Sequence, residues 1–418
     1  MINTQAHNPN SQALKKSEKA ILLAGVIYSL AVSVPYAYID SWRLLGVPGI
    51  NYVASILLLC AVKMATRTLI IDPRMLVLLI WWIWLSVLGL VNLTNPLWSL
   101  KLFLADVLYT GLLPIGYAVG RSISLQAALT TLAYMFIICS SALLLICIML
   151  VTGVLVSYGN TGRFIDPAQY TLHFVAGVTL PAFLKRWEHR RVVQNLAVIG
   201  LTAIGITFSL TSATRSSLIF TLLTTTVAPL IVSGKKSLGI MVICALLAYA
   251  TYVAAPGQSR DFALGNIADR FLQSDTMGDL RFAELTGMLD QLEGHFALGY
   301  GFGVGFFSPI TSSTEGFADI GLAPHIGIFT YLYKGGAVAL LLYISLQIVG
   351  IVRSLKKSSR GKSFAAVMLI GALAISLVSG GYGIAYQLLL GVALGISFSP
   401  EIVDVHHEKR YKRNHPLV

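Results

Sequence analysis

Long apolar runs separated by short polar segments make up most of the chain. Most of these runs reach the length of about 20 residues that a helix needs to cross the hydrocarbon core of a membrane. The pattern predicts an all-α polytopic membrane protein with about twelve transmembrane helices, since a spanning helix satisfies its own backbone groups. The expected spans are residues 20–37, 49–64, 73–92, 101–120, 125–153, 168–184, 193–210, 215–233, 237–255, 324–352, 362–380 and 382–399.

One polar segment is long enough to fold outside the bilayer, and it divides the chain into three parts. Residues 1–255 are expected to form the first nine spans, residues 256–323 a long loop, and residues 324–418 the last three spans with a basic tail. Inside the loop, helical spacing predicts an amphipathic helix with Asp290 opposite its apolar stripe. The stripe is Leu285, Met288, Leu289, Leu292 and Phe296.

The composition agrees with a membrane protein and excludes an ordinary soluble enzyme. Only 11% of the 418 residues are charged, against about 25% in an average soluble domain. The cysteines lie inside apolar runs and are expected to be small membrane hydrophobes, with no disulfide or zinc site. They are Cys60, Cys139, Cys147 and Cys244.

The net charge of +12 follows from membrane topology and requires no nucleic acid partner. Under this span map most of the 30 Lys and Arg residues fall in loops on one side, which the positive-inside rule makes cytoplasmic. Both termini lie on that side, and the first span is expected to remain uncleaved. The long loop, rich in Asp and Glu, then faces the extracytoplasmic side.

Few titratable groups remain on the outer side, and four of them are candidate site residues. Arg215 begins a span among hydroxyl side chains, where it is either an anion clamp at a helix N-terminus or a snorkelling interfacial residue. Arg281 falls on the apolar face of the loop helix, where a buried guanidinium needs a partner. Arg163 either pairs with Asp166 or joins the same anion site.

His325 follows a proline at the start of a span, where it is either a packing residue or a general base. Asp106, His173 and Lys334 lie within expected spans, where an ionisable group is a functional candidate by default. The glycine run at 299–305 matches no nucleotide motif and is expected to form tight turns with close backbone packing. No spacing of His, Cys or carboxylates suits a metal, so no metal or other cofactor is expected.

Three segments together resemble the bacterial O-antigen ligase/polymerase superfamily of membrane glycosyltransferases. They are a Ser/Thr-Arg motif at a span start, an arginine helix leading into a Gly-x-Gly turn, and a histidine opening the next span. Here these are Thr214–Ser217, Arg281 to Gly301, and Pro324-His325 with Gly335-Gly336, within about 160 residues in all. The family's Asn after the histidine is Ile326 in this chain, and its Pro before the turn is Phe296.

The resemblance implies metal-independent, inverting transfer of a glycan from undecaprenyl pyrophosphate at the periplasmic face of the bacterial inner membrane. Arg215 and Arg281 would hold the donor pyrophosphate, Arg163 is added from its position in an outer loop, and His325 would activate the acceptor hydroxyl. In the ligase branch, which chain length and the single long loop favour, the acceptor is lipid A-core oligosaccharide. In the polymerase branch the acceptor is another lipid-linked repeat unit. A transporter or flippase is the remaining alternative, favoured by Asp106 and Lys334.

Overall fold

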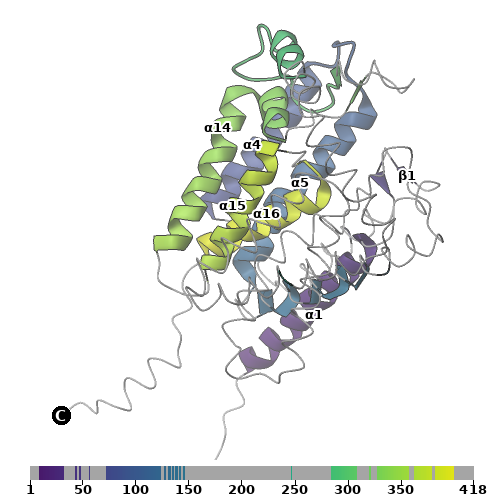
Figure 1. Cartoon of the computed structure of the whole chain (residues 1–418). Coiled ribbons are helices and arrows are strands. Elements are labelled where there is room, and N and C mark those ends of the chain that lie inside the picture. Colours follow the sequence, from purple (N-terminus) through teal and green to yellow (C-terminus); the bar gives the residue numbers. More distant parts are fainter. Residues whose placement is uncertain are drawn as a thin grey trace, which may run out of the picture.

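The computed structural model describes residues 9–32, 43–44, 47–48, 56, 72–123, scattered positions from 127 to 145, 246, 284–307, 320–321, 327–356, 362–378 and 382–399. Helices dominate these residues (Figure 1). They are α1 (Pro9–Val32), α4 (Pro73–Val91), α5 (Leu100–Ser122), α14 (Gly327–Lys356), α15 (Ser363–Val378) and α16 (Ile384–Phe398). Two short antiparallel ladders accompany them, β1 (Arg43–Leu44) with β2 (Val47–Pro48) and β3 (Phe306–Phe307) with β4 (Ile320–Gly321).

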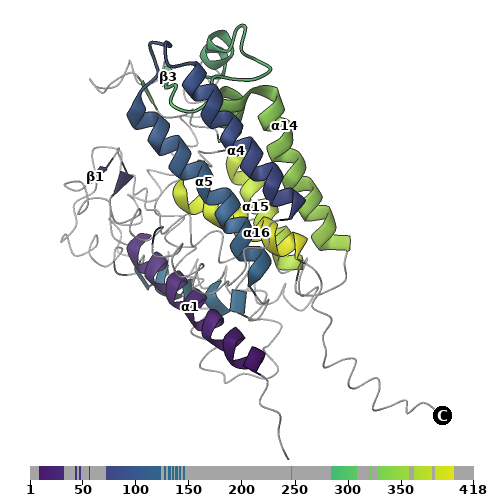
Figure 2. The ribbon, with the colours of Figure 1, turned by 180° about the vertical axis from the view of Figure 1, so that it is seen from behind.

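The helices α4, α5, α14, α15 and α16 form one bundle, and α1 lies to one side of it (Figures 1 and 2). Three of them, α4, α5 and α14, are long and apolar enough to cross a membrane, while the apolar helices α15 and α16 are shorter. Their bounds agree with five of the expected spans to within a few residues. The helical architecture is therefore confirmed, and its long apolar helices are compatible with a membrane protein. The number of twelve spans stays a prediction.

The closest helix pair in the bundle is α5 with α16, and glycine makes it possible. Gly116 and Gly120 on α5 face Gly391 and Gly395 on α16, so each helix carries a Gly-x-x-x-Gly motif. A Cβ at Gly116 would lie 2.2 Å from the Leu388 carbonyl oxygen, and one at Gly395 would lie 2.2 Å from the Tyr117 carbonyl oxygen. Small residues at this spacing let two helix backbones pack directly inside a membrane.

Local sequence signals explain where two of these helices begin. Asp72 precedes α4 and accepts a hydrogen bond from the Met75 N–H at 2.9 Å, and Pro73 follows in the first turn. Ser99 accepts one from the Leu102 N–H at the start of α5. The turn between these two helices, residues 92–99, is short, so α4 and α5 run antiparallel.

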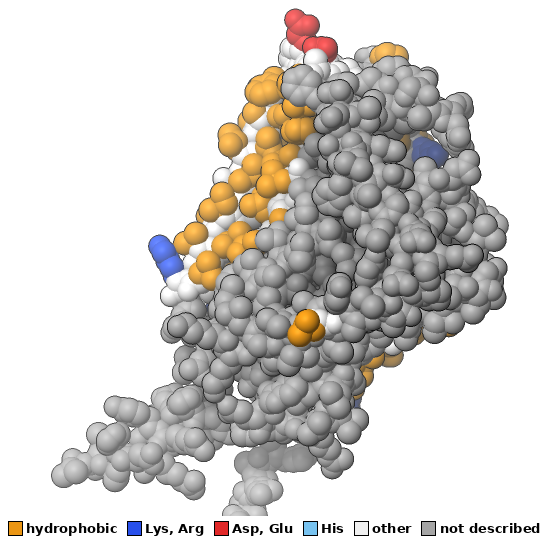
Figure 3. All heavy atoms as spheres, viewed as in Figure 1, with side chains coloured by type: hydrophobic (Ala, Val, Ile, Leu, Met, Phe, Trp, Pro, Cys, Tyr) orange, Lys and Arg blue, Asp and Glu red, His pale blue; other side chains and the backbone are white. Residues whose placement is uncertain are grey.

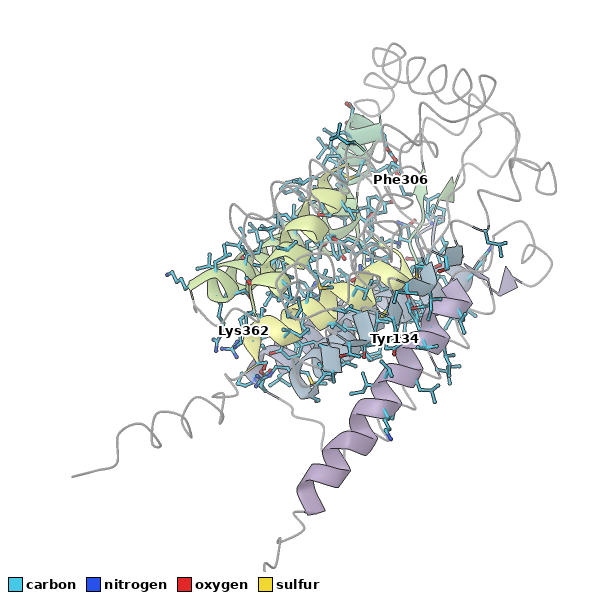
Figure 4. All side chains as sticks on the ribbon, turned by 60° about the horizontal axis from the view of Figure 1, so that its bottom comes forward. Tyr134, Phe306 and Lys362 are labelled. Atoms are coloured by element: carbon cyan, nitrogen blue, oxygen red, sulfur yellow. The ribbon has the colours of Figure 1, made fainter. Side chains whose placement is uncertain are left out.

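The two ends of the bundle differ in charge. Figure 3 shows an apolar strip on the outside of α14, with acidic side chains above its upper end and basic side chains at its lower end. Exposed apolar side chains on this helix include Val338, Leu341, Ile348 and Val352. Such a strip is what a lipid-facing surface requires. Figure 4 labels Lys362 at the lower end and Phe306 at the opposite end.

Two expectations from the sequence change in detail. The first helix begins at Pro9, well before its apolar run at 20–37. The amphipathic loop helix exists at residues 284–291 and buries Met288 and Leu292, but Leu289 and Phe296 are exposed. Those two predictions were wrong because the buried face is narrower and follows the spacing of Glu284, Met288 and Leu292. Cys139 is buried, as expected for a small apolar residue within a span.

Candidate functional site

The structure brings together two of the ionisable residues that the sequence places inside spans, Asp106 of α5 and Lys334 of α14. The other candidates, Arg163, His173, Arg215, Arg281 and His325, lie outside the described residues. Asp106 is six residues into α5, so it lies about 9 Å below the start of that helix at 1.5 Å per residue. This end of the bundle, where α4 ends and α5 begins, is called the outer end after the orientation expected from the sequence. Lys334 lies at a similar depth, seven residues after the start of α14.

Asp106 and Lys334 form an ion pair in the interior of the bundle. The Lys334 Nζ donates to Asp106 Oδ2 at 2.7 Å, and the two side chains are only 1% and 0% exposed. Charges this deep require partners, because an uncompensated ion in a low-dielectric interior costs several kcal/mol.

Both members of the pair have further partners that complete their hydrogen bonding. The Gly303 N–H donates to Asp106 Oδ2 at 2.8 Å, and the Tyr382 hydroxyl donates to Asp106 Oδ1 at 3.0 Å. The Lys334 ammonium also donates to the Val304 carbonyl oxygen at 2.7 Å. Two of these three partners, Gly303 and Val304, belong to the backbone of the glycine run at 299–305. The pair therefore attaches that loop to α5 and α14.

The glycine run enters the bundle from its outer end. The Phe302 N–H donates to the Leu85 carbonyl oxygen of α4 at 3.0 Å. Because Leu85 is six residues before the end of α4, this contact lies about 9 Å below the outer helix ends. All residues from Gly301 to Phe306 are buried. In a membrane protein such an irregular backbone is tolerated only where protein surrounds it.

The loop also compensates for a break in α14. The helix is interrupted at Gly336, whose φ of 65° and ψ of −169° are not helical. Beside the break, the carbonyl oxygens of Tyr333 and Lys334 accept hydrogen bonds from the N–H groups of Tyr300 and Gly301, at 3.1 and 2.7 Å. Beyond it, the Ala337 N–H donates to the Phe296 carbonyl oxygen at 2.9 Å. Backbone groups freed by the break thus find partners in the segment 296–301.

Glycine is required where these backbones meet. Gly301 has a φ of 78°, and a Cβ on it would lie 2.0 Å from the Gly89 nitrogen of α4. A Cβ on Gly299 would lie 2.5 Å from the Gly336 nitrogen, and one on Gly336 would lie 2.3 Å from the Ala297 carbonyl carbon. The expectation of tight turns with close backbone packing is therefore confirmed.

The turn between α4 and α5 holds the other side of the loop. Asn92 donates from Nδ2 to the Tyr300 carbonyl oxygen at 2.8 Å. The Ser99 N–H donates to the Gly303 carbonyl oxygen at 2.9 Å, and the Gly305 N–H donates to the Leu97 carbonyl oxygen at 2.8 Å. One hydrogen-bonded unit therefore forms at the outer end from residues 92–99, the glycine run and the first half of α14.

Helix 284–291 packs against this unit. Met288 and Leu292 share a buried cluster with Leu332 and Tyr333 of α14 and with Val304 and Phe306 of the loop. The Tyr333 hydroxyl donates to the Gly305 carbonyl oxygen at 2.9 Å within the same region. Aromatic rings extend the packing, since Tyr300 lies 5.2 Å from Tyr333 between ring centroids and 4.4 Å from His295.

Sequence reasoning named Asp106, Lys334 and the glycine run separately but missed that they form one arrangement. It also missed Tyr382, which reaches Asp106 from the segment before α16. A tyrosine in an apolar run gives no signal of its own, whereas one acid and one base in different spans suggest a pair. Among the described residues, no group of three or more His, Cys, Asp or Glu side chains could hold a metal.

No protein-family model matches the chain, and no curated protein matches it either.

Within this arrangement Asp106 and Lys334 have a structural task. Every oxygen of the Asp106 carboxylate accepts a protein hydrogen bond, and the Lys334 ammonium has two acceptors. A pair with its partners in place holds backbone segments together, and neither member is aimed at a described cavity. What the arrangement provides is a rigid platform at the outer end of the bundle.

Proposed function

We propose that the protein is a membrane glycosyltransferase that moves a glycan from undecaprenyl pyrophosphate to an acceptor hydroxyl at the periplasmic face. The acceptor in the favoured ligase form is lipid A-core oligosaccharide. Arg215 and Arg281 bind the donor pyrophosphate, Arg163 assists, and His325 activates the acceptor. Arginine suits this task because its planar fork binds phosphate oxygens in a bidentate manner.

The observation that carries the proposal is the packing of helix 284–291 on the first half of α14. Helix 284–291 begins three residues after Arg281, and α14 begins at Gly327, two residues after His325. Met288 of the first helix and Leu332 of the second belong to one buried cluster. Two segments that adjoin the proposed anion-binding arginine and the proposed base are thus held side by side on a rigid platform.

The reaction is a single displacement at the anomeric carbon. The acceptor oxygen attacks that carbon, the bond to the pyrophosphate oxygen breaks, and undecaprenyl pyrophosphate leaves with the bonding electrons. His325 takes the proton of the attacking hydroxyl, and the arginines offset the negative charge that develops on the leaving group. The product has inverted anomeric configuration, and the step needs no metal.

The lipopolysaccharide profile of a deletion strain tests the proposal, with the wild-type chain, His325→Ala or Arg281→Ala supplied back. The expected result is core without O-antigen and polymer retained on the lipid carrier, restored only by the wild-type chain. Arg281→Lys should restore little, because an ammonium cannot replace the bidentate fork. An inserted His325→Ala protein with full activity would remove His325 from the mechanism. Core bearing a single repeat unit would instead identify the polymerase form.

A transporter is the second candidate, and one observation favours it. An interrupted helix beside buried charges is a common design of transporter binding sites, and α14 is interrupted at Gly336, two residues after Lys334. Vesicles containing purified protein separate the two candidates. Glycan transfer between purified donor and acceptor supports the glycosyltransferase, whereas movement of a lipid-linked glycan across the bilayer without transfer supports the transporter.

A further inference from the structure

The end of the bundle opposite the glycine run gathers positive charge from several helices. There α4 and α15 begin, and α5, α14 and α16 end, around the ring of Phe398. The charged side chains described at this end that touch Phe398, Ser399 or one another are four cations and one anion. They are Arg74, Arg121, Arg353, Lys362 and Asp72.

Two of the cations already have backbone partners within the protein. Arg121 donates to the Phe398 carbonyl oxygen at 2.7 Å and pairs with Asp72 at 3.2 Å. Lys362 donates to the carbonyl oxygen of Ser399. Both therefore bind carbonyl groups that the end of α16 leaves without a helical partner.

The other two cations, Arg74 and Arg353, lie against the Phe398 ring. Their guanidinium carbons are 4.6 and 5.6 Å from the ring centroid. Arg74 reaches a carboxylate only at 3.7 Å, and that carboxylate, Asp72, already pairs with Arg121. Within the described part of the chain, Arg353 contacts no carboxylate, and its buried Nε makes no hydrogen bond.

Geometry and position point to one kind of ligand for these two groups. Because both distances share the ring centroid, the two guanidinium carbons are at most about 10 Å apart, a separation that one phosphate group bridges after a small adjustment of a side chain. The Arg74 side chain is 41% exposed, so it has room to adjust. The ends of transmembrane helices lie at the level of lipid headgroups, where basic pockets between helices bind anionic lipids.

We infer that Arg74 and Arg353 form a binding site for a phosphate group at this end of the bundle, beside the Phe398 ring. The group belongs either to an anionic phospholipid or to soluble phosphate. The site lies on the side that the positive-inside rule makes cytoplasmic, away from the residues of the proposed glycosyl transfer. It therefore stands independently of the proposed function.

The test uses the purified full-length protein in nanodiscs of phosphatidylcholine alone, or of phosphatidylcholine with one third phosphatidylglycerol. We expect phosphatidylglycerol to raise the midpoint of thermal unfolding and to remain bound in native mass spectrometry, since a ligand that binds only the folded state stabilises it. Arg353→Gln and Arg74→Gln should each lose most of that gain and retain at least tenfold less phosphatidylglycerol. Lys101→Gln, an exposed cation at the other end of α5, is the matched control and should keep the full gain.

Further arms identify the source of the phosphate and protect the test against misfolding. Inorganic phosphate added to phosphatidylcholine discs should leave the midpoint unchanged if the ligand is a lipid. An equal gain that Arg353→Gln removes would assign the site to soluble phosphate. Arg353→Lys keeps the charge and should retain an intermediate gain if Arg353→Gln does not fold. Equal retention of phosphatidylglycerol by the wild type and the Arg74→Gln/Arg353→Gln double variant would overturn the site.

Discussion

Replacing Gly301 by alanine is the sharpest test of the way the glycine run is built into the bundle. Two separate costs meet at this position. A non-glycine residue at a φ of 78° costs about 1–2 kcal/mol. The added Cβ would also lie 2.0 Å from the Gly89 nitrogen and 2.5 Å from the Leu88 carbonyl carbon, and overpacking of this kind costs about 1–3 kcal/mol.

The backbone at Gly301 cannot move away to relieve the clash without further loss. Its N–H donates to the Lys334 carbonyl oxygen at 2.7 Å, and the next N–H, that of Phe302, donates to the Leu85 carbonyl oxygen at 3.0 Å. A shift that breaks either bond leaves a buried polar group unsatisfied, which costs about 1–3 kcal/mol. We therefore expect Gly301→Ala to lower the free energy of unfolding by about 2–5 kcal/mol in total.

Gly294 provides a matched control, because its φ is also 78° but nothing lies within 4 Å of the position of a Cβ. Gly294→Ala should cost only the backbone term, about 1–2 kcal/mol. The measurement is unfolding of both variants and wild type in mixed detergent micelles, followed by circular dichroism. Equal losses in the two variants would refute the close packing of the glycine run against α4.

Three other changes test the rest of the described structure by the same unfolding measurement. Asp106→Asn and Lys334→Met should each lower the free energy of unfolding by about 3–5 kcal/mol, because each leaves a buried charge unpaired. The double variant should lose less than the sum of the two single losses. Additive losses would contradict the ion pair. Gly120→Ala should destabilise the protein by about 1–3 kcal/mol, because the added Cβ would lie 2.2 Å from the Val392 carbonyl oxygen. Gly111→Ala on the same helix is the control. Its Cβ would lie 3.4 Å from the nearest atom, Trp82 Nε1, so this change should be neutral or stabilising. Burial raises the pKa of Asp72, but the hydrogen bonds from Met75 and Tyr117 and the charges of Arg121 and Arg74 outweigh it and hold the pKa below its usual value. Its contribution is thus present above the unfolded pKa of about 3.9 and is lost as the pH falls through the folded value, so Asp72→Asn should flatten the loss of stability below about pH 4.

The positions of the bundle helices α4, α5, α14, α15 and α16 could be predicted from apolar run length alone. The bounds of α4, α5 and α14 follow from it because a spanning helix must match the hydrocarbon thickness. Run length carries no information on which helices touch. The α5–α16 contact was readable only from the paired motifs Gly116–Gly120 and Gly391–Gly395, whose small residues permit it.

The packing of the glycine run against α4, α5 and α14 could not be predicted from local sequence patterns. The break at Gly336 depends on hydrogen bonds from residues more than thirty positions earlier in the chain, such as Gly301 to Lys334. Local propensity cannot encode such partners. The stripe of helix 284–291 was misjudged at Leu289 because apolar spacing does not reveal how much of a helix its neighbours cover.

The ion pair and the glycine run stabilise each other. A loop that enters a membrane bundle brings backbone groups to a depth where water is scarce, and each group without a partner costs several kcal/mol. The Gly303 N–H and the Val304 carbonyl oxygen are two such groups, and Asp106 and Lys334 serve them with charge-assisted hydrogen bonds. The loop in turn supplies partners that make two buried charges tolerable. Removing the Asp106 charge should therefore loosen the loop before it unfolds the helices, so hydrogen exchange in Asp106→Asn should increase first at residues 299–305.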